Sequence, residues 1–91
     1  MLRRCGGVLA AHRLATIAVL REDGKKAIGE ADSEVAEAID FARYYAVTGE
    51  APAGVEASAL GGGVIAPPWN FPFAIPCGGV LAALMAGNSV M

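Results

Sequence analysis

Apolar residues recur at helical spacing in the middle of the chain. They lie three or four residues apart on one predicted helix face, at Val35, Ala38, Ile39, Ala42 and Tyr45. The opposite face carries Glu37, Asp40 and Arg43. Asp32 or Ser33 can cap the start of this helix, and Glu34 places negative charge in its first turn, where the helix dipole favours it. The apolar stripe needs a partner, most simply a preceding helix.

That preceding helix is predicted from Leu2 to about Glu22, a stretch rich in Ala, Leu and Arg. Gly6 and Gly7 are its weak point, because glycine lowers helix stability. Gly24 is a natural residue just past its end.

The second half of the chain follows a different pattern. Gly, Pro, Ala and Ser without periodicity predict a linker over residues 49–62. A short buried strand is expected from Gly63 to Ala66, and the proline-rich string "PPWNFP" must then leave the strand as a loop. A helix is predicted from Phe73 to about Ala86, with Pro76 in its first turn, before "SVM" begins another strand.

Strand, loop, helix and incipient strand form the start of a βαβ crossover. The predicted fold class is therefore α/β: a helical segment over residues 1–48, the linker over 49–62, and the first part of a parallel sheet over 63–91. One crossover cannot bury both faces of such a sheet, so we expect further strands after Met91 and interpret the chain as part of a larger fold.

Composition narrows the function classes. The sequence is 55% hydrophobic and 18% charged, and all of its acidic and basic residues lie at or before Glu56. An apolar tail over residues 57–91 suits either the core of an α/β domain or a small non-enzymatic protein that associates with a membrane or partner. Prolines leave too short a helix for the roughly 20 apolar residues of a membrane span, which favours the core.

Charge and cysteine content add further expectations. A net charge of −2 provides no basic patch for nucleic acid. Cys5 and Cys77 match neither a metal spacing nor a disulfide framework, so we expect no metal and a cytoplasmic location. The basic N-terminus resembles a signal peptide, but His12 and Arg13 interrupt its apolar run.

Asn70 is the candidate catalytic residue. In open α/β sheets a ligand site lies just past the carboxyl end of a strand, which is where "PPWNFP" falls. A neutral amide donor held between prolines suits an oxyanion, because it stabilises developing negative charge at any pH. The alternative is that Asn70 hydrogen-bonds its own turn. Trp69 can likewise be a core residue or a ligand platform.

The string "PWNFP", after an apolar strand and before an Ala-rich helix ending in "AGNSV", resembles the first nucleotide-binding crossover of the aldehyde dehydrogenase superfamily. "REDGKK" resembles that family's turn between its first helices. "EADSEVAEAIDFARYYA" is similar to the branch that oxidises L-glutamate γ-semialdehyde, or 1-pyrroline-5-carboxylate, in proline catabolism. The likeness spans nearly the whole chain but only an N-terminal portion of the family's fold.

The resemblance implies a Rossmann-like domain, a cofactor (NAD, with NADP possible), an aldehyde substrate and a homo-oligomeric full-length protein. It places the oxyanion-hole asparagine at Asn70. It places the cofactor-binding strand end and loop at Ala66, Pro67, Pro68, Trp69 and Asn70. The family lacks the Rossmann glycine fingerprint, so "GGG" at 61–63 is not interpreted as one.

The family's nucleophilic cysteine, its general-base glutamate and its cofactor-binding lysine match no position in these residues. Cys77 does not align with the nucleophile, and cysteines on apolar helices are usually packed as small hydrophobes. The resemblance therefore implies that this polypeptide alone is inactive.

Overall fold

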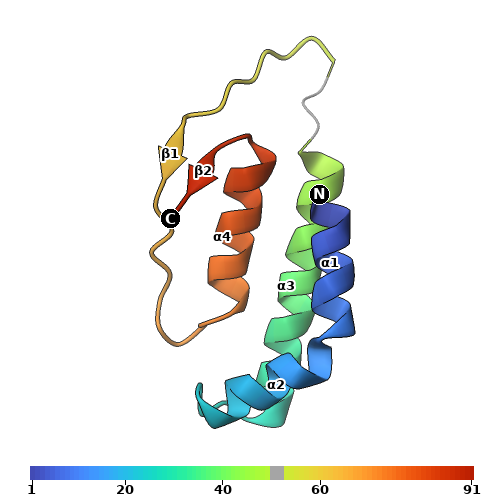
Figure 1. Ribbon diagram of the computed structural model, residues 1–91, viewed down its shortest axis with the longest axis vertical. Helices are drawn as coiled ribbons and strands as arrows, with labels where there is room; N and C mark the ends of the chain where they lie inside the picture. The colour runs from blue at the N-terminus through green and yellow to red at the C-terminus, as the bar shows by residue number, and fades with distance from the viewer. Residues whose placement is uncertain (50–52) are drawn as a thin grey trace.

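The computed structural model describes residues 1–49 and 53–91 (Figure 1). Its elements, in chain order, are α1 (Leu2–Ala11), α2 (Arg13–Glu22), α3 (Ile28–Thr48), β1 (Gly62–Gly63), α4 (Ala74–Met85) and β2 (Ser89–Val90). Helix α3 lies at the centre, because α1 packs along one side of it and α4 along another, while α2 crosses near its first turns.

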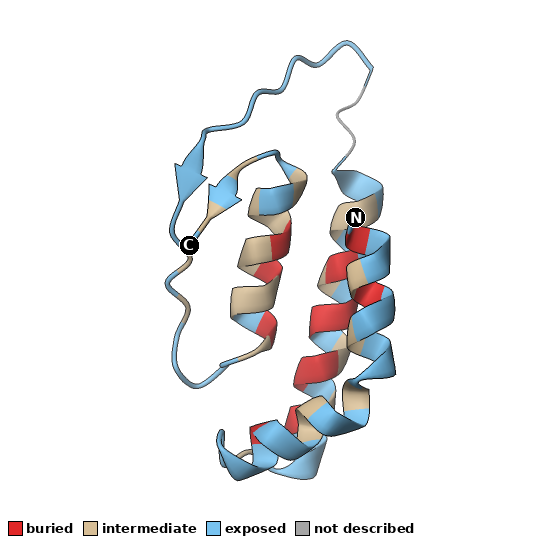
Figure 2. Cartoon of the chain, in the orientation of Figure 1, coloured by how far each residue is buried: buried red, intermediate tan, exposed pale blue. Residues whose placement is uncertain are grey.

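The apolar stripe predicted for α3 forms the core. Val35, Ala38, Ile39 and Ala42 are buried, and Tyr45 is half-buried. One end of the stripe packs against Leu20 of α2, and the other against both α1 and α4. Figure 2 shows the buried positions on the faces that these helices turn toward one another. The first helical segment is therefore a partner of α3, as predicted, but α4 is a second one.

The first helical segment is broken at His12 and not at the glycines. His12 has φ −101° and ψ 13°, outside the helical region, and its Nδ1 lies 2.9 Å from the carbonyl oxygen of Val8. Gly6 is buried where α1 meets α3, and a Cβ there would lie 3.5 Å from that of Ala42. The predicted weak point at Gly6 and Gly7 does not interrupt the helix, because α1 continues through both of them and Gly6 lies at the helix contact.

Helix α3 begins before the predicted caps. Its first residue is Ile28, and the Glu30 carboxylate accepts a hydrogen bond from the Ala27 amide at 3.2 Å. Asp32 is therefore not a cap and instead forms an ion pair with Arg13 of α2 at 2.7 Å. Glu34 lies beyond the first turn, so its predicted role at the start of α3 was wrong.

The two strands pair in parallel on either side of α4 in the sequence, which confirms a strand–helix–strand unit. Gly62 pairs with Ser89 and Gly63 with Val90. The observed β1 is shorter than the predicted strand from Gly63 to Ala66 and starts one residue earlier. Val64 is 71% exposed, so the expectation of a buried strand was wrong for this chain: a two-stranded sheet has no layer over its outer face.

The predicted linker over residues 49–62 includes residues 50–52, which lie outside the described residues. From residue 53 to residue 61 the backbone is a turn followed by irregular chain. Within residues 1–49 and 53–91, no helix combines the length and the apolarity needed to cross a bilayer.

Two helical glycines offer a matched test of the packing. A Cβ on Gly78 of α4 would lie 2.8 Å from the Phe41 ring on α3, whereas one on Gly7 of α1 would meet nothing within 4 Å. We expect Gly78→Ala to lower the free energy of unfolding by about 1–3 kcal/mol through overpacking. Gly7→Ala is expected to raise it by roughly 0.5–1 kcal/mol, because alanine favours the helix.

Chemical denaturation of both variants checks this pair. A Gly78→Ala chain as stable as the Gly7→Ala chain would contradict the close packing of α4 on α3.

Candidate functional site

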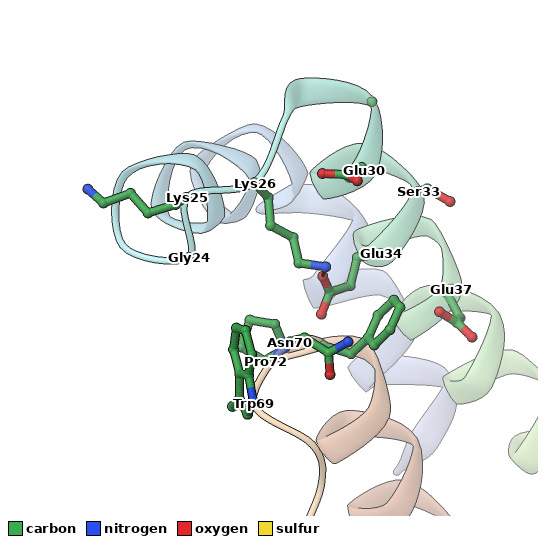
Figure 3. Close-up of a pocket in the computed structure, with 12 residues that line it drawn as sticks. Gly24, Lys25, Lys26, Glu30, Ser33, Glu34, Glu37, Trp69, Asn70 and Pro72 are labelled. Atoms are coloured by element: carbon green, nitrogen blue, oxygen red, sulfur yellow. Dashed lines mark ion pairs between the residues drawn. The ribbon is translucent and has the colours of Figure 1, made fainter.

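Residues 64–73 leave β1 as irregular backbone and turns and carry the chain to the start of α4. With the N-terminal half of α3 they enclose an open cleft of about 570 Å³. It is lined by Gly24, Lys25, Lys26, Gly29, Glu30, Ser33, Glu34, Glu37, Trp69, Asn70, Phe71 and Pro72. Figure 3 shows the carboxylates of α3 on one side and Trp69, Asn70 and Pro72 on the other.

Asn70 lies on the surface of this cleft. Its side chain is exposed, and within residues 1–49 and 53–91 it forms no side-chain hydrogen bond. The alternative that Asn70 hydrogen-bonds its own turn is therefore not what this structure contains. Both N–H groups of the amide remain available to a ligand.

The other predicted cofactor-binding residues lie along the same irregular segment. Ala66 and Pro68 are exposed, Pro67 is half-buried, and Trp69 is 90% exposed. Trp69 is therefore not a core residue in this chain. The structure brings these residues and Asn70 together on one stretch of backbone after β1, and their role in binding a cofactor stays a prediction.

A buried carboxylate on α3 anchors the end of this segment. Glu34 is 3% exposed, and its Oε1 accepts hydrogen bonds from the amides of Phe73 at 2.7 Å and Ala74 at 3.1 Å. These amides belong to the N-cap and first residue of α4. Glu34 therefore caps the N-terminus of a different helix, where the positive end of the dipole favours a carboxylate.

Lys26 completes the anchor. Its Nζ lies 2.8 Å from Glu34 Oε2 and 4.4 Å from the centre of the Phe71 ring. Lys25, just before it, has a left-handed backbone (φ 53°), a sharp turn between α2 and α3 after which Lys26 extends toward α3. One ammonium group thus contacts both the buried carboxylate and the residue that follows Asn70.

These contacts set the charge of Glu34. Burial by itself would raise the pKa of this carboxyl group, but the ion pair with Lys26 and the hydrogen bonds from the two backbone amides outweigh it. The pKa of Glu34 lies below its ordinary value as a result, and the group is ionised at neutral pH.

Sequence reasoning missed Glu34 as a site residue. A signal was present, because Glu34 falls four residues before Ala38 and eight before Ala42, on the apolar face of its own helix. A charged residue at such a position is almost never buried without a partner.

The cysteines fit a packing role. Cys77 is half-buried on α4 and packs in the cluster of Leu2, Ala42 and Leu81, with Cys5 also against that cluster. Burial, with a smaller contribution from Cys5, raises the pKa of the Cys77 thiol, which disfavours the reactive thiolate. Within the described part of the chain, no group of three side chains is arranged to hold a metal ion.

Comparison with known proteins agrees with the motif at the loop. Residues 1–91 match the aldehyde dehydrogenase family. The chain is 36% identical over 104 aligned residues to 1-pyrroline-5-carboxylate dehydrogenase of Anoxybacillus flavithermus. It is 37% identical over 106 aligned residues to the protein of the same name from Bacillus mycoides. Each alignment covers 100% of this chain and 20% of the relative. It is 51% identical over 73 residues to the bifunctional protein PutA of Rhizobium meliloti, covering 80% of this chain and 6% of that protein.

The chain thus spans about a fifth of the length of the 1-pyrroline-5-carboxylate dehydrogenases that it matches. No solved structure matches it. Because the family match covers every residue, this chain belongs to the aldehyde dehydrogenase family.

Proposed function

We propose that these residues form part of an NAD(P)-dependent dehydrogenase that oxidises L-glutamate γ-semialdehyde to glutamate in proline catabolism. The names of the full-coverage relatives support this substrate. The observation that carries the proposal is the exposed Asn70 amide at the cleft, on a bend whose far end is anchored to α3. Residues 63–91 would then open a Rossmann-like domain, after a helical segment over 1–48 and a linker over 49–62.

In this reaction a thiolate from outside these residues adds to the aldehyde carbonyl, and the carbonyl oxygen gains negative charge. The Asn70 amide donates to that oxygen without titrating, so it stabilises the charge at any working pH. A bend that is already fixed needs little reorganisation as the charge develops. Asn70 therefore acts as one donor of an oxyanion hole.

The cofactor would lie against the exposed side of residues 66–69. Ala66, Pro67, Pro68 and Trp69 carry no charged group, so they suit an apolar wall and not a phosphate-binding site. The exposure of Trp69 and Pro68 leaves this wall open to a ligand. When bound, NAD(P) supplies the acceptor for the hydride, while this chain supplies only the surface that orients it.

Apolar exposure on the sheet side supports a larger protein over a small membrane-associated one. Leu60, Val64 and Met91 are 96%, 71% and 87% exposed around a parallel pair of strands. Parallel sheets are normally covered on both faces, so these residues suit the interior of a larger α/β domain. The 1-pyrroline-5-carboxylate dehydrogenases that the chain matches are about five times as long.

The role of Asn70 can be measured in a chimera in which this chain replaces the matching segment of the Anoxybacillus flavithermus dehydrogenase. We expect Asn70→Ala to lower kcat by roughly 10²–10³-fold, the usual effect of removing one oxyanion donor. The readout is the initial rate of NADH formation with glutamate semialdehyde. Ser58→Ala, which removes an exposed polar group outside the cleft, is the matched control.

Equal kcat values for the two folded variants would overturn the assignment of Asn70. A folded chimera that oxidises other aldehydes but not glutamate semialdehyde would instead overturn the proposed substrate.

The polypeptide of residues 1–91 is expected to form no NADH with any aldehyde, because neither of its two cysteines has the environment of a nucleophile. Incubation of the purified chain with NAD and glutamate semialdehyde, with absorbance at 340 nm as the readout, checks this. A rate above that of a heat-denatured sample would contradict it.

A further inference from the structure

We propose that Glu34, held by Lys26, is a positioning residue that fixes the Asn70 bend from the neighbouring helix. The anchoring of the bend by Glu34 is argued from the contacts between α3 and α4. The effect of this anchoring on catalysis rests on the proposed function. It concerns a residue that contacts neither substrate nor cofactor directly.

The first step is that α4 cannot cap itself. Phe73 occupies its N-cap position and has no side-chain acceptor, and Pro76 has no amide hydrogen. The amide of Cys77 bonds to the Phe73 carbonyl at 3.0 Å. The amides of Phe73 and Ala74 therefore depend on Glu34 Oε1, which lies 39 and 40 residues earlier in the chain.

The second step is that the same pair also contacts a residue within the bend itself. Lys26 Nζ lies over the Phe71 ring at 4.4 Å while its charge pairs with Glu34 Oε2 at 2.8 Å. Residues 71, 73 and 74 are thus tied to one ion pair. Asn70 is the residue immediately before this anchored stretch, so its direction depends on the pair.

The third step concerns charge. A buried carboxylate is costly unless it is paired, and removing one partner of a buried pair leaves the other without compensation. Lys26 is 13% exposed and Glu34 is 2% exposed as side chains, so solvent screens the pair only partly. Glu30, Glu37 and Lys25 also line the cleft, but the Lys25 ammonium points away from the pair and donates to the Glu22 carbonyl at 2.6 Å (Figure 3). The segment 57–91 contributes no charged side chain.

Nuclear magnetic resonance of the 91-residue chain tests the anchor. We expect the backbone amide signals of Phe73 and Ala74 and the side-chain NH₂ signals of Asn70 to shift together as pH falls. Their common midpoint should lie below the ordinary glutamate value of about 4.3. In Glu34→Gln this shared titration disappears and the Asn70 side chain becomes more mobile on the nanosecond timescale. Asp40→Asn, which removes an exposed carboxylate of α3 outside the cleft, should change neither.

Independent titration of the Phe73 and Ala74 amides would overturn the anchor, as would an Asn70 side chain equally ordered in Glu34→Gln. Lys26→Met is a second variant, in which the Glu34 carboxylate still accepts hydrogen bonds from the Phe73 and Ala74 amides. It should raise the midpoint seen at Phe73 and Ala74, because the ammonium is lost and only the amides remain. An unchanged midpoint, or a wild-type chain without dispersed signals for these amides, contradicts the proposal.

Acid unfolding gives a separate prediction. The pKa of Glu34 is lowered in the folded chain, so its contribution to stability is present above the unfolded-state pKa and is lost as pH falls through the folded-state value. The denaturation midpoint of wild type should therefore fall more steeply below about pH 4.3 than that of Glu34→Gln. Parallel curves for the two chains would contradict a buried, ionised Glu34.

The effect of Glu34 on catalysis can be measured in the chimera described under the proposed function. Glu34→Gln should lower kcat roughly 10–100-fold with little change in KM, because a small misplacement of a catalytic group is enough for such a loss. In an Asn70→Ala background the same substitution should have almost no further effect. If Asn70→Ala lowers kcat but Glu34→Gln does not, the positioning role fails. If Asn70→Ala itself has no effect, the proposed function fails while the resonance experiment still decides the anchor.

Discussion

Helix α4 has a phenylalanine at its N-cap position and a proline in its first turn, so the amide groups at its start need an acceptor from elsewhere. A glutamate in the second turn of α3 supplies it, and a lysine from the turn before α3 pairs with that glutamate. The arrangement needs three segments at once: the α2–α3 turn, the second turn of α3 and the bend before α4. Since the acceptor is buried, any of the three that moves leaves a charge or an amide unpaired in a dry environment. The direction of the bend is therefore coupled to the packing of the helices.

That packing depends on small residues at the points of closest approach. Gly6 of α1 faces Ala42 of α3, and Gly78 of α4 lies beneath the Phe41 ring. Close contact lets α3 support two helices on different sides with a short chain, and it keeps the start of α4 within hydrogen-bond distance of Glu34. At the far end of α4, Asn88 accepts from the Gly61 amide at 2.9 Å and donates to the Ala83 carbonyl at 3.2 Å, which ties the strand pair to the helix. Both ends of α4 are thus fixed by side chains.

Much of this fold could be predicted from the sequence, because its periodicity is local. The α3 stripe, the bend at residues 67–72, the helix after it and the strand at the end follow from apolar spacing and from the chemistry of proline and glycine. The start of α3 was misplaced because Asp32 is a good cap by type, yet Arg13 and not a helix amide is its partner. The break at His12 was missed because nothing in its local sequence forbids a helix. The role of Glu34 was missed because its partners lie 39 and 40 residues away, a distance that no local pattern reports.

The exposure of Asn70 and Trp69 has a physical implication for an oxyanion site. A neutral amide stabilises a developing alkoxide well only when water is excluded, because water competes for the same oxygen and screens the dipole. In this chain the amide is directed by the anchored bend, but the cleft beside it is open. In the proposed reaction, these residues would hold the amide donor in place. Water would be excluded by surfaces outside these residues, because the relatives are about five times as long as this chain. On the proposed function, the direction of the donor would come from the anchored bend, and the exclusion of water would come from elsewhere in the longer protein.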